Sequence, residues 1–108
     1  MKLPADTIIS REKLTHYLLR AREDHDKSGF LALAGYSLEN ADQLASDLRT
    51  QLLPLEAVAA ETTLYGEKFI IRGRLVGPTG RVLKVFSVWI VEKATGLSKF
   101  VTLYPDRP

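Results

Sequence analysis

The feature that most constrains this chain is the alternation of apolar and charged side chains along residues 66–76. The apolar positions are Phe69, Ile71 and Leu75, and they alternate with the basic positions Lys68, Arg72 and Arg74. A period of two is typical of a β-strand with one wet face. The sequence Gly77-Pro78-Thr79-Gly80 has Pro and Gly where a reverse turn needs them. Residues 82–91 are apolar on both faces, which predicts a central strand and an antiparallel hairpin.

Two further segments extend this hairpin into a sheet. A turn at residues 94–96 leads into an apolar run at residues 100–104, and Pro105 ends that run. Residues 57–60 suit either a short edge strand or a continued helix, and we interpret them as a strand. The pattern therefore predicts a four-stranded antiparallel β-meander, the main part of which runs from about Tyr65 to Tyr104.

The first half of the chain has helical spacing instead. Ser10 is predicted to cap a helix that ends near Ala21, with Leu14, Tyr17 and Leu18 on its buried side. After the polar stretch 22–27, a short helical turn over residues 30–33 is expected to stop at Gly35. Ser37 is then predicted to cap a second main helix, which Pro54 ends. The predicted fold class is α+β, with two or three N-terminal helices packed on the meander.

Length and composition predict one globular domain over residues 1–108. Apolar residues make up 45% and charged residues 26% of the 108, as in ordinary folded domains. The absence of cysteine excludes disulfides and thiolate metal sites, and two histidines cannot build a zinc site alone. We expect no metal and no cofactor. No apolar run has the length of a signal peptide or membrane span, so we expect no membrane association and a cytoplasmic location.

Basic residues are concentrated in the second half of the chain. Residues 61–108 carry 8 basic and 4 acidic side chains. This bias is compatible with a polyanionic partner such as RNA. Solvated strand faces also carry Lys and Arg to discourage edge pairing, so a purely structural interpretation stays open.

The chain lacks the strong general motifs of metal and nucleotide enzymes. It has no phosphate-cradling Gly loop, no His-Glu-x-x-His and no Gly-x-Ser-x-Gly elbow. The remaining cations, aromatics and hydroxyls suit polyanion binding or metal-free RNA cleavage. That reaction needs a base for the 2′-hydroxyl proton, an acid for the leaving 5′-oxygen, and cations for the phosphorane.

The candidate catalytic residues lie in the polar loop, after the hairpin turn and at the end of the last strand. Lys27 would supply charge and His25 would move a proton, unless both belong to a solvated loop. Arg81 follows the turn glycine, where it would anchor a phosphate or merely finish the turn. Thr102 and Tyr104 are predicted to share one strand face and to contact the same phosphate.

The candidate substrate-binding residues lie on the sheet. Arg72 and Arg74 share one face of their strand, and Lys84 is expected near them across the hairpin. This group would hold phosphates or would simply be a solvent face. Lys68 and Tyr65 complete the binding set, because a strand-end Tyr can hold a base or a phosphate.

Four short motifs between residues 63 and 105 resemble a family of uncharacterised small bacterial proteins. They are Tyr65-Gly66-Glu67-Lys68-Phe69, Gly77-Pro78-Thr79-Gly80-Arg81, Val88-Trp89-Ile90 and Thr102-Leu103-Tyr104-Pro105. Residues 2–4 and 11–19 are also similar to that family. The resemblance therefore spans most of the chain.

That family resembles the barnase, EndoU, colicin and RelE-type ribonuclease-toxin superfamily, in which helices precede a four-stranded antiparallel sheet. The resemblance implies a metal-independent endoribonuclease toxin with a cognate antitoxin or immunity-type partner. In the family, the polar loop carries a Lys followed two residues later by Arg, whereas Lys27 here is followed by Gly29. A non-catalytic protein- or RNA-binding module with the same fold is the alternative.

Overall fold

The computed structural model describes residues 1–20 and 27–106 of the chain. The helical elements are η1 (Lys13–Leu18), α1 (Ser28–Ala32), η2 (Leu38–Asn40), α2 (Ala41–Asp47) and η3 (Leu48–Leu52). The strands are β1 (Val58–Thr62), β2 (Gly66–Val76), β3 (Val82–Glu92) and β4 (Ser98–Pro105). Helices precede strands, so the predicted α+β class is confirmed. The predicted end of the first helix near Ala21 lies outside the described residues.

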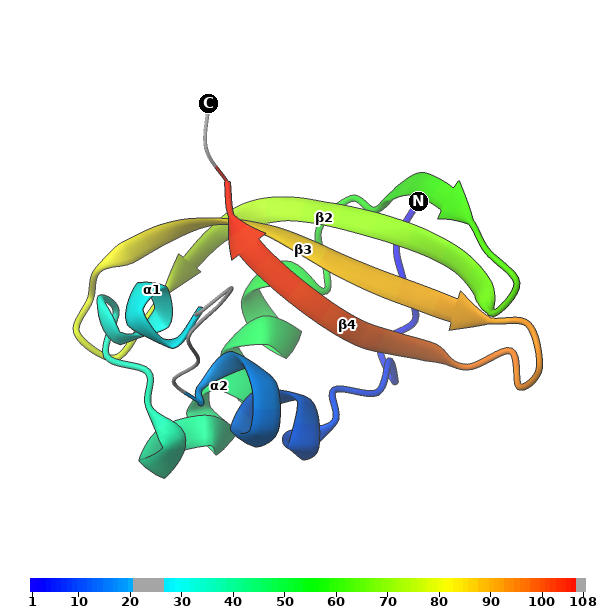
Figure 1. The fold of residues 1–108 in the computed structure, drawn as a ribbon. Helices are drawn as coiled ribbons and strands as arrows, with labels where there is room; N and C mark the ends of the chain where they lie inside the picture. The colour runs from blue at the N-terminus through cyan, green and yellow to red at the C-terminus, as the bar shows by residue number, and fades with distance from the viewer. Residues whose placement is uncertain (21–26, 107–108) are drawn as a thin grey trace.

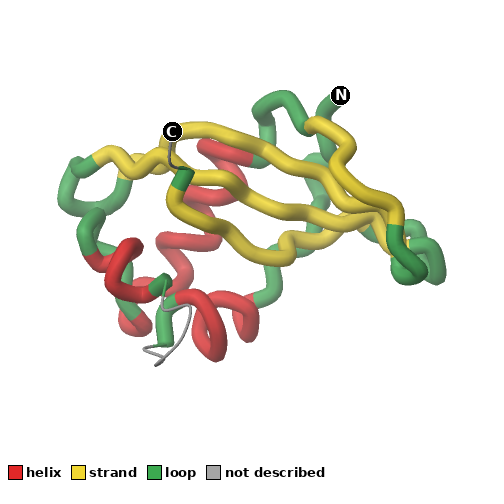
Figure 2. Tube along the Cα trace, turned by 45° about the horizontal axis from the view of Figure 1, so that its top comes forward, coloured by secondary structure: helices red, strands yellow, loops and turns green. Residues whose placement is uncertain are grey.

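The strands form one antiparallel sheet in the order β1-β2-β3-β4. The segment that suited either a strand or a helix forms most of β1. Figures 1 and 2 show that the helices lie against one face of this sheet, which we call the inner face. The opposite, outer face carries none of the described helices.

The core lies between the inner face and the helices. Trp89 of β3 is fully buried and packs edge-to-face on Phe100, with ring centroids 5.1 Å apart. Its indole Nε1 donates to Ser87 Oγ at 2.8 Å, and that hydroxyl donates to the Ile71 carbonyl at 2.6 Å. The buried polar atoms of the Trp89 and Ser87 side chains are therefore satisfied.

A second buried hydrogen-bond network fixes the helical layer. Tyr36, just after the turn at Gly35, donates its hydroxyl to Asp47 Oδ2 at 2.6 Å, and Gln43 Nε2 donates to Asp47 Oδ1 at 2.9 Å. Burial, together with the Asp47 carboxylate, raises the pKa of Tyr36 well above its usual range. The phenol is therefore a permanent donor at neutral pH.

The ends of the second main helix follow the prediction. Ser37 forms a capping box with Asn40, whose side-chain Oδ1 accepts from the Ser37 backbone N–H at 2.7 Å. The helical segment runs through η2, α2 and η3 and stops before Pro54. Capping and a following proline therefore set both boundaries.

The first helix differs from the prediction at Tyr17. Leu14 and Leu18 are buried as expected, but Tyr17 is 56% exposed. The reason is that η1 is a π-helix, in which the Leu19 N–H donates to the Leu14 carbonyl five residues earlier, at 2.8 Å. The wider turn buries Leu19 and leaves Tyr17 outside the core.

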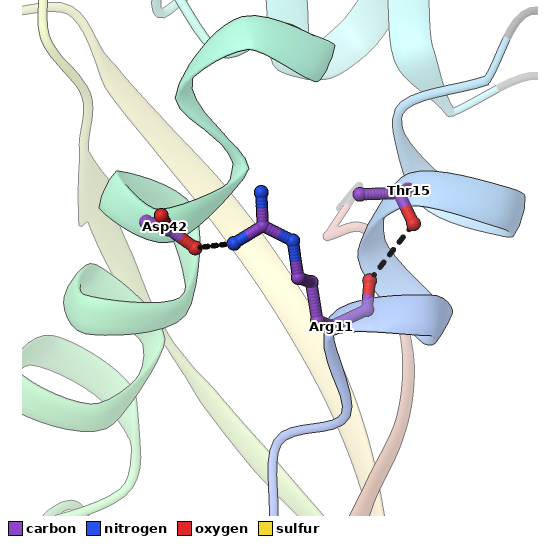
Figure 3. Close-up of polar contacts among 3 residues, drawn as sticks. All are labelled: Arg11, Thr15 and Asp42. Atoms are coloured by element: carbon purple, nitrogen blue, oxygen red, sulfur yellow. Dashed lines mark hydrogen bonds and ion pairs between the residues drawn. The ribbon is translucent and has the colours of Figure 1, made fainter.

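An ion pair and a hydrogen bond accompany η1 at its start. Arg11 pairs with Asp42 of α2, and the Thr15 hydroxyl donates to the Arg11 carbonyl at 3.1 Å (Figure 3). Arg11 and Asp42 are both exposed, so their pairing contributes about 0 to 1 kcal/mol. The buried leucines of η1, rather than this pair, hold the helix in place.

Candidate functional site

A β-bulge sets the direction of the side chains at the end of β4. Trp89 pairs with Phe100 and the preceding Val88 pairs with Thr102, so Val101 is an extra residue in β4. A regular strand would put Phe100, Thr102 and Tyr104 on one face. The bulge instead leaves Phe100 in the core, 2% exposed, and turns Thr102 and Tyr104 to the outer face.

Lys27 meets these two residues from the helical side of the chain. Its Nζ donates to Thr102 Oγ1 at 2.6 Å and lies 3.9 Å from the centroid of the Tyr104 ring. The second contact has the geometry of a cation–π interaction. Three of the five predicted catalytic residues therefore converge, although 75 positions separate Lys27 from Thr102.

A small pocket opens beside this group at the edge of the sheet. Its volume is about 230 Å³, and its lining residues are Lys13, Tyr17, Leu18, Lys27, Val101, Thr102 and Tyr104. We call it the edge pocket. Its walls carry two lysines and two tyrosines, and Lys13 Nζ lies 5.9 Å from the Tyr17 ring centroid. Cations and aromatic rings therefore surround the same space.

A second hollow of about 230 Å³ adjoins the edge pocket on the outer face. It shares three residues of β4 with the edge pocket and adds residues from β1, β2 and β3. The shared residues are Val101, Thr102 and Tyr104, and the others are Ala60, Glu61, Lys68, Ile70 and Val88. Thr102 and Tyr104 therefore contribute to both hollows. We call the second one the sheet hollow.

The outer face continues as a row of cations and rings. Arg72, Phe86 and Tyr104 are opposite one another on β2, β3 and β4. The Arg72 guanidinium carbon is 5.0 Å from the Phe86 ring centroid, and the Phe86 and Tyr104 centroids are 6.4 Å apart. In the next row, Arg74 is directly opposite Lys84. Arg72, Arg74 and Lys84 therefore share the face on which Tyr104 lies.

Arg81 lies away from the convergent group. It directly precedes β3, and the turn before it packs on the end of the α1 segment, where the Thr79 N–H donates to the Ala34 carbonyl at 3.1 Å. Arg81 is five residues before Phe86, which is opposite Tyr104, a separation of about 16 Å along a strand. The register does not bring Arg81 to Lys27.

The other predicted residues are also dispersed. Tyr65 is 79% exposed before β2, and its carbonyl accepts from the Lys93 N–H at the far end of the sheet. Lys68 lines the sheet hollow. His25 lies outside the described residues. Lys27, Thr102 and Tyr104 therefore form the candidate site, with Lys68, Arg72, Arg74 and Lys84 beside it.

Two residues of the edge pocket were missed by sequence reasoning. Tyr17 was assigned to the core, and Lys13 was given no role. The sequence did hold one signal for the exposure of Tyr17, which is the apolar residue Leu19. Leu14, Leu18 and Leu19 form the buried side of the first helix, so Tyr17 is not needed there. That arrangement depends on a π-turn, which apolar spacing of the α-helical type does not predict.

Two further observations apply to the described part of the chain. Residues 1–20 and 27–106 contain no group of three or more His, Cys, Asp or Glu side chains arranged to hold a metal ion. Within the same ranges, no helix has both the length and the apolar character needed to span a bilayer.

The chain thus has an α+β fold with a cationic, aromatic pocket where its last strand meets its first helix. It belongs to the family described as Domain of unknown function (DUF6883), whose model matches residues 2–107. A comparison with curated proteins finds no match to this chain.

One solved structure supports the fold assignment. A chain of a contact-dependent growth inhibition toxin and immunity protein complex from Klebsiella pneumoniae 342 is similar, with a TM-score of 0.60 and 19% sequence identity. The alignment covers 93% of this chain and 100% of that one. At this identity the likeness establishes a shared fold. Membership of the ribonuclease-toxin superfamily stays a prediction.

Proposed function

We propose that this protein is a metal-independent endoribonuclease toxin whose active site is centred on Lys27, Thr102 and Tyr104. The observation that carries the proposal is the convergence of these side chains, with Lys27 Nζ 2.6 Å from Thr102 Oγ1 and 3.9 Å from the Tyr104 ring centroid. They border an open pocket rather than the core. A fold shared with a chain of a toxin and immunity protein complex agrees with this assignment.

The site contains groups that metal-free RNA cleavage requires. In that reaction the 2′-oxygen attacks phosphorus and the 5′-oxygen leaves, which gives a 2′,3′-cyclic phosphate and a free 5′-hydroxyl. Lys27 would neutralise the charge that builds up on the phosphorane, and Thr102 would donate to one of its oxygens. Tyr104 would protonate the leaving 5′-oxygen. His25, two residues before Lys27 in sequence, is the candidate base for the 2′-hydroxyl proton.

The outer face would supply the binding surface for the RNA backbone. Lys68, Arg72, Arg74 and Lys84 follow one another over β2 and β3 on the face that carries Tyr104. Contacts of cations with phosphates are independent of sequence and weaken as salt rises. Arg81, at the distant end of β3, would contact a phosphate remote from the cleaved bond.

A toxin that cuts RNA requires a neutralising partner in the cell that makes it. The solved complex with the similar fold joins a growth inhibition toxin to an immunity protein. We therefore expect this chain to bind a cognate antitoxin or immunity-type protein. Because the proposed substrate is cellular RNA, we place the action of the toxin in the cytoplasm.

Induced expression in a bacterium tests the proposal. The parent chain is expected to arrest growth and to fragment RNA into pieces that end in a 2′,3′-cyclic phosphate. Lys27→Met and Tyr104→Ala should relieve the arrest, whereas Lys93→Met, in the exposed turn between β3 and β4, should not. Healthy growth at high levels of the folded parent protein would refute the proposal.

The alternative is a binding module without catalytic activity, including an immunity-type role. Its support is Gly29, which stands where the resembled family has a basic residue, and the presence of both components in the similar complex. Space is open around Gly29, since a Cβ there would meet no atom within 4 Å. Gly29→Arg should therefore increase the toxicity of a weak nuclease. A binding module would remain harmless with either residue.

A further inference from the structure

We propose that the edge pocket is a subsite for one unpaired RNA base, in which Tyr17 stacks on the base and Lys13 holds the adjoining phosphate. This inference rests on the proposed nuclease function and deepens it, because it names single-stranded RNA as the substrate. Neither residue was a candidate from the sequence.

The conformation of η1 is the first argument. Its π-turn buries Leu14, Leu18 and Leu19, each at most 5% exposed, while Tyr17 is 56% exposed. A π-turn is a rare conformation that is frequently found at functional sites. Here its consequence is to place an aromatic ring on a pocket wall rather than in the core.

The chemistry of the edge pocket is the second argument. Lys13 and Lys27 provide positive charge, and Tyr17 and Tyr104 provide aromatic surface. Proteins that hold single strands combine these two elements, because phosphates pair with cations and every base has a face that can stack. The volume of about 230 Å³ is smaller than the 300 to 1,000 Å³ or so of most ligand pockets, and it suits one base.

The adjoining sheet hollow indicates the path of the RNA strand. Thr102 and Tyr104 line both hollows, and Lys68 lines only the second. A base in the edge pocket would therefore have its neighbour over the sheet hollow. The phosphate between the two bases would then lie at Thr102 and Lys27, where the proposed cleavage takes place. Bases of a duplex are stacked and paired, so only an unpaired strand fits this arrangement.

Binding of an uncleavable oligonucleotide tests the inference. The probe is a fluorescein-labelled, 2′-O-methylated RNA single strand of about eight nucleotides, followed by anisotropy with the intact chain. The methyl group blocks attack by the 2′-oxygen. Tyr17→Ala should weaken binding about 5- to 150-fold, the range of one lost stacking contact, whereas Tyr17→Phe should bind like the parent.

Three controls make the result specific. Tyr65→Ala removes another exposed tyrosine at the far end of the sheet and should leave affinity unchanged. Thermal unfolding of each variant checks that the fold is intact. Tyr17→Leu, which keeps an apolar side chain without a ring, should weaken binding as Tyr17→Ala does.

Each outcome decides the inference separately from the proposed function. Parent affinity in Tyr17→Ala, tighter binding of the matching duplex, or no binding of the probe by the parent would overturn the subsite. The nuclease proposal is decided by cleavage of unmethylated RNA. A chain that holds the probe through Tyr17 but cuts no RNA would keep the subsite and refute the nuclease.

Discussion

The inner and outer faces of the same sheet are built on different principles. On the inner face, hydrogen bonds run from Trp89 to Ser87 and from Ser87 to the Ile71 carbonyl. No described buried side-chain polar atom lacks a partner. On the outer face, Arg72 lies over Phe86, and Tyr104 remains 45% exposed. Successive side chains of a β-strand point to opposite faces, so one residue can stabilise the core while its neighbour is available for binding. Substitutions on the inner face should therefore reduce stability, whereas substitutions on the outer face should reduce RNA cleavage or binding.

The largest effect is expected from Trp89→Ala on the inner face. It removes the largest fully buried side chain and leaves a cavity, which should lower the free energy of unfolding by about 3 to 5 kcal/mol. Chemical denaturation measures this loss. Trp89→Phe, which keeps a ring, should lose less. An equally stable alanine variant would contradict the division between the faces.

Lys27→Met should have the next largest effect, on activity rather than stability. Loss of a charge that stabilises the transition state lowers cleavage by about 10²- to 10³-fold. The midpoint of denaturation should change little, because the Lys27 ammonium contacts groups at the rim of an open pocket. Lys27→Arg, which keeps the charge, should retain part of the rate. If Lys27→Met were unfolded, Lys27 would have to be counted among the residues that stabilise the fold, as those of the inner face do.

Tyr36→Phe should destabilise the helical layer without affecting the site. The Asp47 carboxylate, only 9% exposed, would lose a donor at 2.6 Å, a loss of about 1 to 3 kcal/mol. Urea titration and RNA cleavage, measured on the same preparation, separate the two effects. Tyr65→Phe, at a tyrosine that is 79% exposed at the far end of the sheet, serves as the matched control.

The same tyrosine predicts how stability changes in alkali. The pKa of Tyr36 is raised in the folded chain, so the unfolded chain loses this proton first, near the ordinary value of 10.0. Stability should therefore be complete below about pH 10 and fall as pH rises further. Tyr36→Phe should flatten this fall in thermal unfolding at graded pH. An unchanged slope would show that other groups cause it.

Arg74→Gln should have the smallest effect. This exposed cation opposite Lys84 would lose one phosphate contact, so binding should weaken uniformly across RNA sequences and the salt slope should decrease by about 1. Stability should change by less than about 0.5 kcal/mol. Titration at several salt concentrations measures the slope, with Lys93→Gln as the control. A sequence-dependent loss would indicate base contacts by Arg74.

The sequence predicted the features that depend on local signals. Period-two alternation identified the long strands, and Ser37 and Pro54 marked the second main helix. Lys27 and Thr102 were each predicted to be catalytic residues, but only tertiary packing brings the two side chains together. Arg81 shows the converse, because its turn was predicted from local sequence and its distance from Tyr104 follows from strand register. Residues far apart in sequence leave no local pattern that reports such distances.

The π-turn of η1 and the bulge in β4 were the least predictable features. Both insert one residue into a regular period, and both change which side chains face the core. Leu19 and Val101 are ordinary apolar residues, so their types do not mark the irregularity. The edge pocket depends on both features, since one places Tyr17 and the other places Thr102 and Tyr104.

The bulge also limits which mutations this lineage can inherit. Val101 is the extra residue of the bulge, so its replacement by another residue of similar size should be tolerated. Deletion of its codon would instead move the side chains on one side of the bulge to the opposite face of β4. A strand shortened by one residue must either withdraw Phe100 from Trp89 or turn Thr102 and Tyr104 toward the helices. Single-codon deletions at this point should therefore be absent from active members of the family, and surviving changes in length should occur in pairs.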